Sequence, residues 1–446
     1  IGGRPVAYRR QGRKLLIVPG APVRNGARFT VTVSYEGSPR LIGEPGSPAL
    51  GWSNYGQGSY VASEPDGAEA WYPVNDHPLD KAAYTFRITV PKPYVVAANG
   101  LWQGTIPHAT ATTYVWQTRY PVASYLTTVA IDRFAVVRSA GPHGLPIRDY
   151  FPQDVATPAT RIFAQQPAMI AYYERILGPY PFEAYGSVVA GARFGWALET
   201  QTLSLFSRTI VDHPSQEAIA HELAHQWFGD SVSLKDWRDI WLNEGFATYL
   251  SWLWLTRSGG PAALARQVQR WHALFLEIPA YDALLHGNAL PGPRVLGILR
   301  TIFRLRGRPR SDAQILRFAG VSSAAALSAA LALRKLGLAP GSGQAHEIDE
   351  LTRSSAPGTP PRDDLFAPSV YYRGALALHA LRLRVGDHAF FAILRTYAQR
   401  YRYANADTAD FIAVADEVSG QRLDALLDTW LYARQVPSLP PTAVHP

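Results

Sequence analysis

Two histidines four residues apart, with a glutamate beside the first, form the most informative pattern of this chain. His221, Glu222 and His225 belong to the string HELAH. On a helix, this spacing places both imidazoles on one face, where they can bind one metal ion. Glu244 follows after a gap of eighteen residues, in the helix-like run NEGFATYLSWLWL. Two His and one Glu form the ligand set of a catalytic zinc site that keeps its fourth position for water, and the absence of Cys excludes cysteine-based structural zinc sites.

The residues around the two histidines predict the helix that such a site requires. Residues 215–217 (SQE) supply a helix start with acid in the first turn, and Gly229 supplies a stop. Ile219, Leu223 and Trp227 form an apolar stripe at helical spacing. An H-E-x-x-H string also arises by chance on ordinary helices. The matching carboxylate on the next predicted helix favours a metalloenzyme with one zinc ion per chain.

The same residues carry a family resemblance. The H-E-x-x-H string, the eighteen-residue gap and the following NEGFA resemble the M1 family of zinc aminopeptidases, a gluzincin group. Glu199, in GWALETQT, falls at the G-x-M-E-N exopeptidase motif of that family, which implies that it holds the free α-amine of a peptide. Glu64, in SEPDGAEAWYPVNDHP, falls at a second anchor for that amine. Tyr371, in VYYRGALALHALR, falls at the catalytic tyrosine of the family.

The chain departs from the exopeptidase motif at three positions. Trp196 stands in place of the first Gly, Leu198 in place of Met, and Thr200 in place of Asn. In the family this motif lines the substrate backbone as an edge strand. A large Trp is therefore expected to narrow or reshape the first subsite, and the preferred first residue of the substrate stays undecided.

The residue types predict hydrolysis of a peptide bond by a metal-activated water. Glu222 is expected to take the proton of this water and to pass it to the leaving amine. The Tyr371 hydroxyl is expected to stabilise the oxyanion, a role worth roughly 10²–10³ in rate for one donor. Asn243 and Asp230 are candidates for groups that support the metal ligands from behind, although either could equally be a turn or cap residue.

Length and pattern predict an α+β protein of two domains. The 446 residues, 47% of them apolar, suffice for large buried cores. Residues 1–137 are predicted to form an N-terminal β-sheet domain, with strands such as FTVTVSY, YTFRITV, TTYVWQT and YLTTVAI. Residues 138–446 are predicted to form a thermolysin-like, mainly helical zinc-peptidase catalytic domain. The resemblance further implies that the first strands of the N-terminal domain are missing, and that the cleft is open because no large C-terminal helical domain roofs it.

A basic insert at about residues 291–362 separates the zinc motif from Tyr371. Within 294–336, nine basic residues accompany one acid, and this excess of +8 equals the formal net charge of the whole chain. The basic character therefore does not indicate nucleic-acid binding. VLGILRTIFRLR predicts a basic amphipathic helix, and the Ala/Leu run around 321–333 predicts a second helix folding back on it. We favour an extra helical hairpin or an irregular insertion over contact with a membrane surface or an acidic partner.

A zinc aminopeptidase that acts on peptides with a free N-terminus is the leading hypothesis. The first alternative is a zinc endopeptidase of the gluzincin type, in which the altered motif no longer requires a free amine. The second is a degenerate family member that binds peptides or membranes, against which the complete set of ligand and catalytic residues argues. No apolar run reaches the eighteen residues of a membrane span. The compartment stays open, with an extracellular location slightly preferred.

Overall fold

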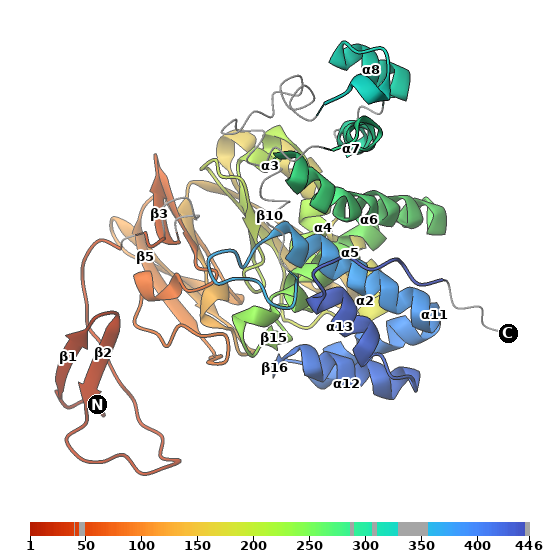
Figure 1. Ribbon diagram of the computed structural model, residues 1–446. Coiled ribbons are helices and arrows are strands. Elements are labelled where there is room, and N and C mark those ends of the chain that lie inside the picture. Colours follow the sequence, from red (N-terminus) through yellow and green to blue (C-terminus); the bar gives the residue numbers. More distant parts are fainter. Residues whose placement is uncertain (40, 44–49, 286–289, 306–309, 329–355, 442–446) are drawn as a thin grey trace.

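The structure is a computed structural model that describes residues 1–39, 41–43, 50–285, 290–305, 310–328 and 356–441. Figure 1 shows a strand-rich N-terminal part beside a helical C-terminal part. The α+β class predicted from the sequence is confirmed. The two parts meet along a cleft, whose residues come from both.

The N-terminal part is built from antiparallel strands. A separate hairpin comes first, followed by a four-stranded sheet in the order β3-β4-β9-β6 and a three-stranded sheet in the order β5-β8-β7. Apolar side chains of both sheets share one core, which includes Val61, Trp116 and Ala130. The strands are β1 (Ala7–Gln11), β2 (Lys14–Val18), β3 (Gly51–Tyr55), β4 (Gly58–Ala62), β5 (Thr85–Pro91), β6 (Val95–Ala98), β7 (Leu101–Pro107), β8 (Ala111–Gln117) and β9 (Val129–Asp132).

Two of the expected strands differ from the structure. The run FTVTVSY, residues 29–35, is not part of any sheet within the described residues, and Phe29 and Tyr35 are 57% and 61% exposed. In YLTTVAI, a 3-10 turn (Ser124–Leu126) comes first and only β9 enters a sheet. Alternation of apolar residues predicts extended backbone, but a strand also needs a partner, which local sequence does not reveal.

A mixed five-stranded sheet in the order β10-β11-β12-β14-β13 begins the second part. The predicted domain boundary after residue 137 falls inside β10, the first strand of this sheet. Strands β13 and β14 are short and antiparallel, with a turn between them, and β13 lies at the sheet edge. The strands are β10 (Phe134–Ala140), β11 (Pro146–Pro152), β12 (Ser187–Ala190), β13 (Ala197–Leu198) and β14 (Ser204–Ser207).

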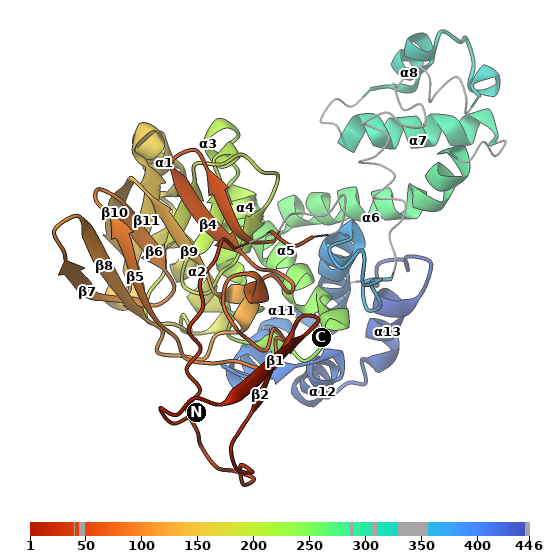
Figure 2. The same ribbon diagram turned by 90° about the vertical axis from the view of Figure 1, so that its left-hand side faces the viewer.

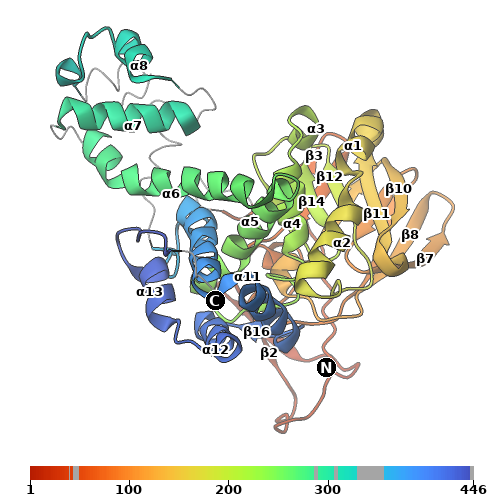
Figure 3. The same ribbon diagram turned by 90° about the vertical axis from the view of Figure 1, so that its right-hand side faces the viewer.

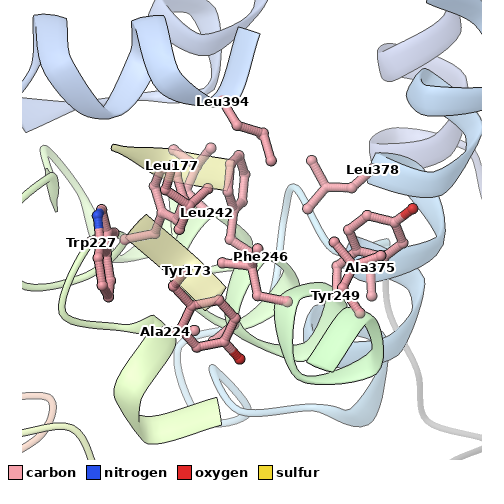
Figure 4. Packing of buried hydrophobic residues seen from close by; sticks show 14 of the residues in the cluster. Tyr173, Leu177, Ala224, Trp227, Leu242, Phe246, Tyr249, Ala375, Leu378 and Leu394 are labelled. Atoms are coloured by element: carbon pink, nitrogen blue, oxygen red, sulfur yellow. The ribbon is translucent and has the colours of Figure 1, made fainter. Parts of the chain in front are cut away.

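The helices pack around α5, in which every residue from Trp241 to Trp254 is buried. Figure 4 shows side chains of α2, α5 and α11 meeting in this core, together with Ala224 and Trp227 from the segment that carries the two histidines. Phe246 lies near the centre of the view. A helix buried on all sides carries apolar residues on every face, as α5 does, although it also buries polar side chains such as Asn243 and Glu244. Within the described residues, no helix has the length and apolar character to cross a bilayer. The helices are α1 (Ala156–Phe163), α2 (Gln166–Leu177), α3 (Thr209–Asp212), α4 (Gln216–Ala224), α5 (Trp241–Thr256), α6 (Gly260–Leu285), α11 (Gly374–Arg400), α12 (Thr408–Ser419) and α13 (Asp424–Tyr432), and two short strands, β15 (Ser233–Leu234) and β16 (Asn405–Ala406), pair in parallel.

The described helices of the basic insert, α7 (Gly292–Leu305) and α8 (Asp312–Ala319), form a small unit beside α6, away from the sheets (Figures 2 and 3). The expected amphipathic helix is α7, and its buried residues Val295 and Leu299 pack in one cluster with Ile315 of α8. The prediction of a second helix at 321–333 is wrong where the structure describes it, because 321–328 contains only a 3-10 turn; residues 329–333 lie outside the described residues. A capping box at Ser311 starts α8 earlier in the chain, and Gly320 ends it.

Candidate metal centre and active site

The helix that carries the histidines starts as its sequence predicts and ends early. The Ser215 side chain accepts a hydrogen bond from the backbone N–H of Ala218 and caps α4. The helix ends at Ala224, well before Gly229, and His225 is its C-terminal cap. His225 keeps helical dihedral angles (φ −57°, ψ −25°), so both imidazoles still lie on one face. Gly229 has φ +128°, and a Cβ there would lie 3.2 Å from His225 Nδ1, so only Gly fits this turn.

Three ligand atoms face one another beside this helix. His221 Nε2 lies 3.0 Å from His225 Nε2 and 3.1 Å from Glu244 Oε2, and the third side of the triangle is 3.4 Å. Bonds of about 2.0–2.1 Å to a tetrahedral zinc ion require ligand atoms about 3.3 Å apart. The three observed separations lie within about 0.3 Å of that value. The donor set therefore fits one zinc ion without rearrangement.

Hydrogen bonds orient the imidazole of His225, and neighbouring charges set the ionisation of His225 and Glu244. Nδ1 of His225 lies 3.1 Å from the Phe228 carbonyl oxygen, and an N–H donated there leaves Nε2 free for a metal. Burial opposes ionisation of Glu244, yet the charge of His225 and hydrogen bonds from both imidazoles lower its pKa to about 2. Burial also lowers the pKa of His225, but Glu199 and Glu244 outweigh it and raise this pKa well above its ordinary value. The surrounding carboxylates thus stabilise positive charge at this point.

A second acidic group lies in the same cleft. Glu64 follows β4, Glu199 follows β13, and both are buried, with 8% and 2% of their surface exposed. One carboxylate oxygen from each lies within 4.8 Å of a Glu244 oxygen and of the other. Oε1 of Glu64 and Oε1 of Glu199 have no hydrogen-bond partner among the described residues. Burial and neighbouring carboxylates raise the pKa of Glu64 well above its usual range, and burial raises that of Glu199. A cation with several N–H donors would satisfy both side chains.

Glu222 and Tyr371 complete the cleft. Glu222 is buried, and this burial raises the pKa of its carboxyl well above the usual range. Tyr371 belongs to a π-helical turn (Ser369–Arg373) that leads into α11, and its ring lies against His221 with centroids 5.9 Å apart. Burial, followed by the charge of Glu244, raises the pKa of Tyr371 well above its usual range, so its hydroxyl stays protonated as a donor.

A close approach of two helices holds Tyr371 near the metal ligands. A Cβ at Gly245 would lie 2.9 Å from the backbone of Gly374, so α5 and the start of α11 touch where neither has a side chain. The guanidinium of Arg373 donates from Nε to the Trp430 carbonyl oxygen at 2.8 Å. The ring of the neighbouring Tyr372 instead stacks on Trp271, with centroids 3.5 Å apart. Tyr371 is thus the tyrosine whose ring packs on a metal ligand.

The cleft has a volume of about 610 Å³ and brings all seven predicted site residues together. The three ligands and Glu222 come from α4, its C-terminal cap and α5, whereas the acidic pair comes from the ends of two strands. The residues around it are Glu64, Phe194, Gly195, Trp196, Ala197, Glu199, Phe206, Ser207, Thr209, Ile210, His213, Ser215, Glu217, Ala218, His221, Glu222, His225, Glu244, Thr248, Tyr371 and Tyr372.

Comparisons with known proteins agree with this geometry. The sequence model described as "Peptidase family M1 domain" matches residues 163–283 and 342–430, which include both halves of the metal motif and Tyr371. The part of the chain that this model matches is an M1 peptidase domain. A crystal structure of an M1 zinc metallopeptidase from Deinococcus radiodurans is 27% identical, with a TM-score of 0.71, and the match covers 100% of this chain and 85% of that one.

Curated relatives of this M1 chain are much longer. Glutamyl aminopeptidase of Bitis rhinoceros is 26% identical over 394 residues, which cover 84% of this chain and 34% of that protein. Aminopeptidase M1-B of Oryza sativa subsp. japonica is 24% identical over 384 residues, 81% of this chain and 35% of that protein. The chain thus spans about a third of the length of these relatives.

Two residues that the M1 resemblance did not single out hold backbone segments next to the site: Gln226 holds the segment at Glu199, and Lys81 holds the turn at residues 230–231. Gln226, next to a metal ligand, donates from Nε2 to the Glu199 carbonyl oxygen at 3.0 Å and accepts from the Thr202 backbone N–H at 2.9 Å. Lys81, from the N-terminal part, donates from Nζ to the carbonyl oxygens of Asp230 at 3.0 Å and Ser231 at 3.1 Å. Gln226 could have been found as a polar residue beside an apolar helix face. Lys81 has no local signal, because its partners lie some 150 residues away in the chain.

The two predicted supporting residues lie near the site without bonding to the ligands. Asn243 donates from Nδ2 to the Tyr125 hydroxyl at 3.4 Å. Both carboxylate oxygens of Asp230 lack a hydrogen-bond partner among the described residues, and burial raises its pKa well above the usual range. The structure records no hydrogen bond from either described side chain to His221, His225 or Glu244. Asn243 and Asp230 both lie at the turn around Gly229 that follows α4.

Proposed function

We propose that this chain is the catalytic part of a zinc aminopeptidase, which removes N-terminal residues from peptides. The observation that carries the proposal is the pairing of two sites in one cleft. A triangle of three metal-ligand atoms lies within a few ångströms of two buried carboxylates, each of which has one oxygen without a hydrogen-bond partner among the described residues. A metal site alone supports hydrolysis at any peptide bond. The adjoining acidic pair adds a place for a free α-ammonium group, which in a peptide only the N-terminal residue carries.

His221, His225 and Glu244 would hold the zinc ion. When bound, zinc supplies a Lewis acid and makes water a stronger nucleophile at neutral pH. Glu222 takes the proton of the attacking water and delivers it to the leaving amine, so that one carboxylate serves both halves of the reaction. The protonated Tyr371 hydroxyl donates a hydrogen bond to the oxyanion that develops on the scissile carbonyl.

Glu199 and Glu64 would bind the substrate ammonium. This contact satisfies two buried oxygens that otherwise lack donors, and it fixes the first peptide bond at the metal. A solved M1 relative, a mutant of the zinc metallopeptidase from Deinococcus radiodurans, was crystallised with a Tyr-Ser-Ala substrate; it is 27% identical and its TM-score is 0.71. This relative supports peptides as the substrate class.

Loss of a ligand should abolish metal binding. His221→Ala or Glu244→Ala should reduce the zinc content of the purified protein from about one ion per chain to near zero, because two donors do not complete a stable site. Elemental analysis after dialysis measures this. His272→Ala is a matched control, since this histidine binds the Pro437 carbonyl oxygen elsewhere in the fold. Retention of zinc by both ligand variants would contradict the assignment.

Substitutions of Tyr371 and of its neighbour Tyr372 should have different effects on kcat. Tyr371→Phe removes one donor from the oxyanion, so kcat should fall by about 10²–10³ while KM changes little. Tyr372→Phe should change kcat by less than about threefold, because the Tyr372 ring stacks on Trp271 and not on a metal ligand. Steady-state kinetics on one aminoacyl amide measures both. The reverse order would mean that Tyr372 is the catalytic tyrosine.

The proposed activity is tested with a panel of chromogenic aminoacyl amides. Purified protein loaded with zinc should release chromophore from several of them. A chelator should stop the reaction, and added zinc should restore it. If none of the panel is hydrolysed by zinc-loaded protein, the aminopeptidase proposal fails.

A further inference from the structure

Two aromatic rings line the cleft beyond the metal site. Phe194 and Trp196 are half-buried, and their ring centroids lie 4.2 Å apart. We call this pair the aromatic wall. No step of the proposed chemistry uses either ring, and a tryptophan that presents apolar surface to a cleft is a common binding element.

The wall is fixed by contacts on its far side. The Phe194 ring stacks on Tyr60 at 5.1 Å between centroids, and Tyr60 lies 6.1 Å from Tyr55. The Tyr55 hydroxyl donates to Oδ2 of Asp132 at 2.7 Å, and the Phe194 backbone N–H donates to Oγ of Ser207 at 2.8 Å. The rings are therefore held before any peptide arrives, so binding against them costs little additional ordering.

Strand β13 and helix α4, which both line the cleft, indicate where the aromatic wall lies relative to a bound peptide. Strand β13 leads into Glu199, and Trp196 immediately precedes this strand, at most about 10 Å back along the chain from Glu199. Phe194 lies before the bend at Gly195. Helix α4 lines the same cleft and runs from its N-terminal cap, Ser215, to His225, which lies 3.9 Å from a Glu199 oxygen. The acidic pair, the metal ligands and the aromatic wall therefore all line one cleft.

A peptide whose amine lies at Glu199 can extend along the free edge of β13, which is the edge strand of its sheet. Its first carbonyl lies at the metal, and its second and third residues follow along the edge of β13, antiparallel to that strand. Trp196 then lies beyond the cleaved bond, rather than at the first residue as the sequence alone led us to expect.

We propose that the aromatic wall binds an apolar or aromatic side chain of the second or third residue of the peptide. Phe194 and Trp196 thereby set a preference on the far side of the cleaved bond. The proposal rests on the proposed aminopeptidase function. Its chemical basis is burial of an apolar side chain between preformed rings, which favours such peptides roughly tenfold over peptides with glycine there.

Two peptide series test the proposal. Ala-Xaa-Ala-Ala and Ala-Ala-Xaa-Ala, with Gly, Leu, Phe, Lys or Glu as Xaa, are compared by kcat/KM for release of the first alanine. Phe should exceed Gly roughly tenfold in at least one series. Trp196→Ala should erase this difference, mainly through KM. Trp102→Ala, which removes a 47% exposed tryptophan of β7, should leave it unchanged.

Aminoacyl amides separate failure of the wall from failure of the function. Unsubstituted aminoacyl amides such as alaninamide, assayed by release of ammonia, carry no side chain or aryl group beyond the cleaved bond. Trp196→Ala should therefore hydrolyse them at the normal rate, which also shows that the variant is folded. Trp196→Leu, which keeps an apolar side chain, should retain part of the preference. Equal rates across both series, a preference for Lys directed by Glu217 of α4, or a preference that survives Trp196→Ala would overturn the proposal. No hydrolysis of any aminoacyl amide would instead count against the proposed function.

Discussion

Glu222→Gln is expected to lower kcat by about 10²–10⁴ while the protein still binds one zinc ion per chain. Gln has nearly the same shape as Glu but cannot accept the proton of the attacking water. The carboxylate is not one of the three atoms of the ligand triangle, so the metal should stay. Kinetics and elemental analysis on the same preparation give both numbers.

Glu217→Gln is the matched control for this experiment. Glu217 lies on the same helix and lines the same cleft, but it precedes the histidines by one turn. Its replacement should change kcat on an aminoacyl amide less than threefold in rough terms. A Glu222→Gln variant of near-normal activity, with the control also normal, would remove Glu222 from the proposed role of general base.

Glu199→Ala is expected to lower turnover of dipeptides by roughly two to three orders of magnitude. Deleting one partner of a desolvated ion pair costs about 2–5 kcal/mol, and Glu199 is 2% exposed. Zinc content should remain at one ion per chain, because the side chain lies outside the ligand triangle. Kinetics on a dipeptide, together with metal analysis, checks both statements.

Glu183→Ala serves as the control for loss of a carboxylate. Glu183 accepts a hydrogen bond from the Arg119 backbone away from the cleft, so its removal should leave dipeptide turnover near normal. If Glu199→Ala behaves like this control, the ammonium is bound elsewhere and the acidic pair has another role.

The parts of the site that short-range pattern describes were predictable. The spacing of His221 and His225, the Ser215 cap and the apolar run around Glu244 each follow from helical periodicity, which acts over one or two turns. The fact that α4 ends at Ala224 was not predictable, because Gly229 marks where the chain turns back rather than where helical hydrogen bonding stops. The two imidazoles still lie on one face despite this early end of α4, because His225 keeps helical dihedral angles.

Features of the fold that depend on residues far apart in the chain could not be predicted from local sequence. The run at 29–35 has the alternation of a strand, yet no strand pairs with it among the described residues. Gln226 and Lys81 act on backbone groups that only the tertiary fold brings near them. In the insert, the capping box at Ser311 was a usable local signal for α8, but the Ala/Leu run downstream was the stronger helix pattern.

The most direct test of the account compares one peptide with and without an acetyl group on its N-terminus. Zinc-loaded protein is incubated with each, and products are identified by mass. The free peptide should lose its first residue, then the next, and a chelator should prevent both losses. The acetylated peptide should remain intact, because it lacks the ammonium that Glu199 and Glu64 bind. Equal cleavage of both peptides, or cleavage at internal bonds first, would contradict the aminopeptidase account and favour an endopeptidase.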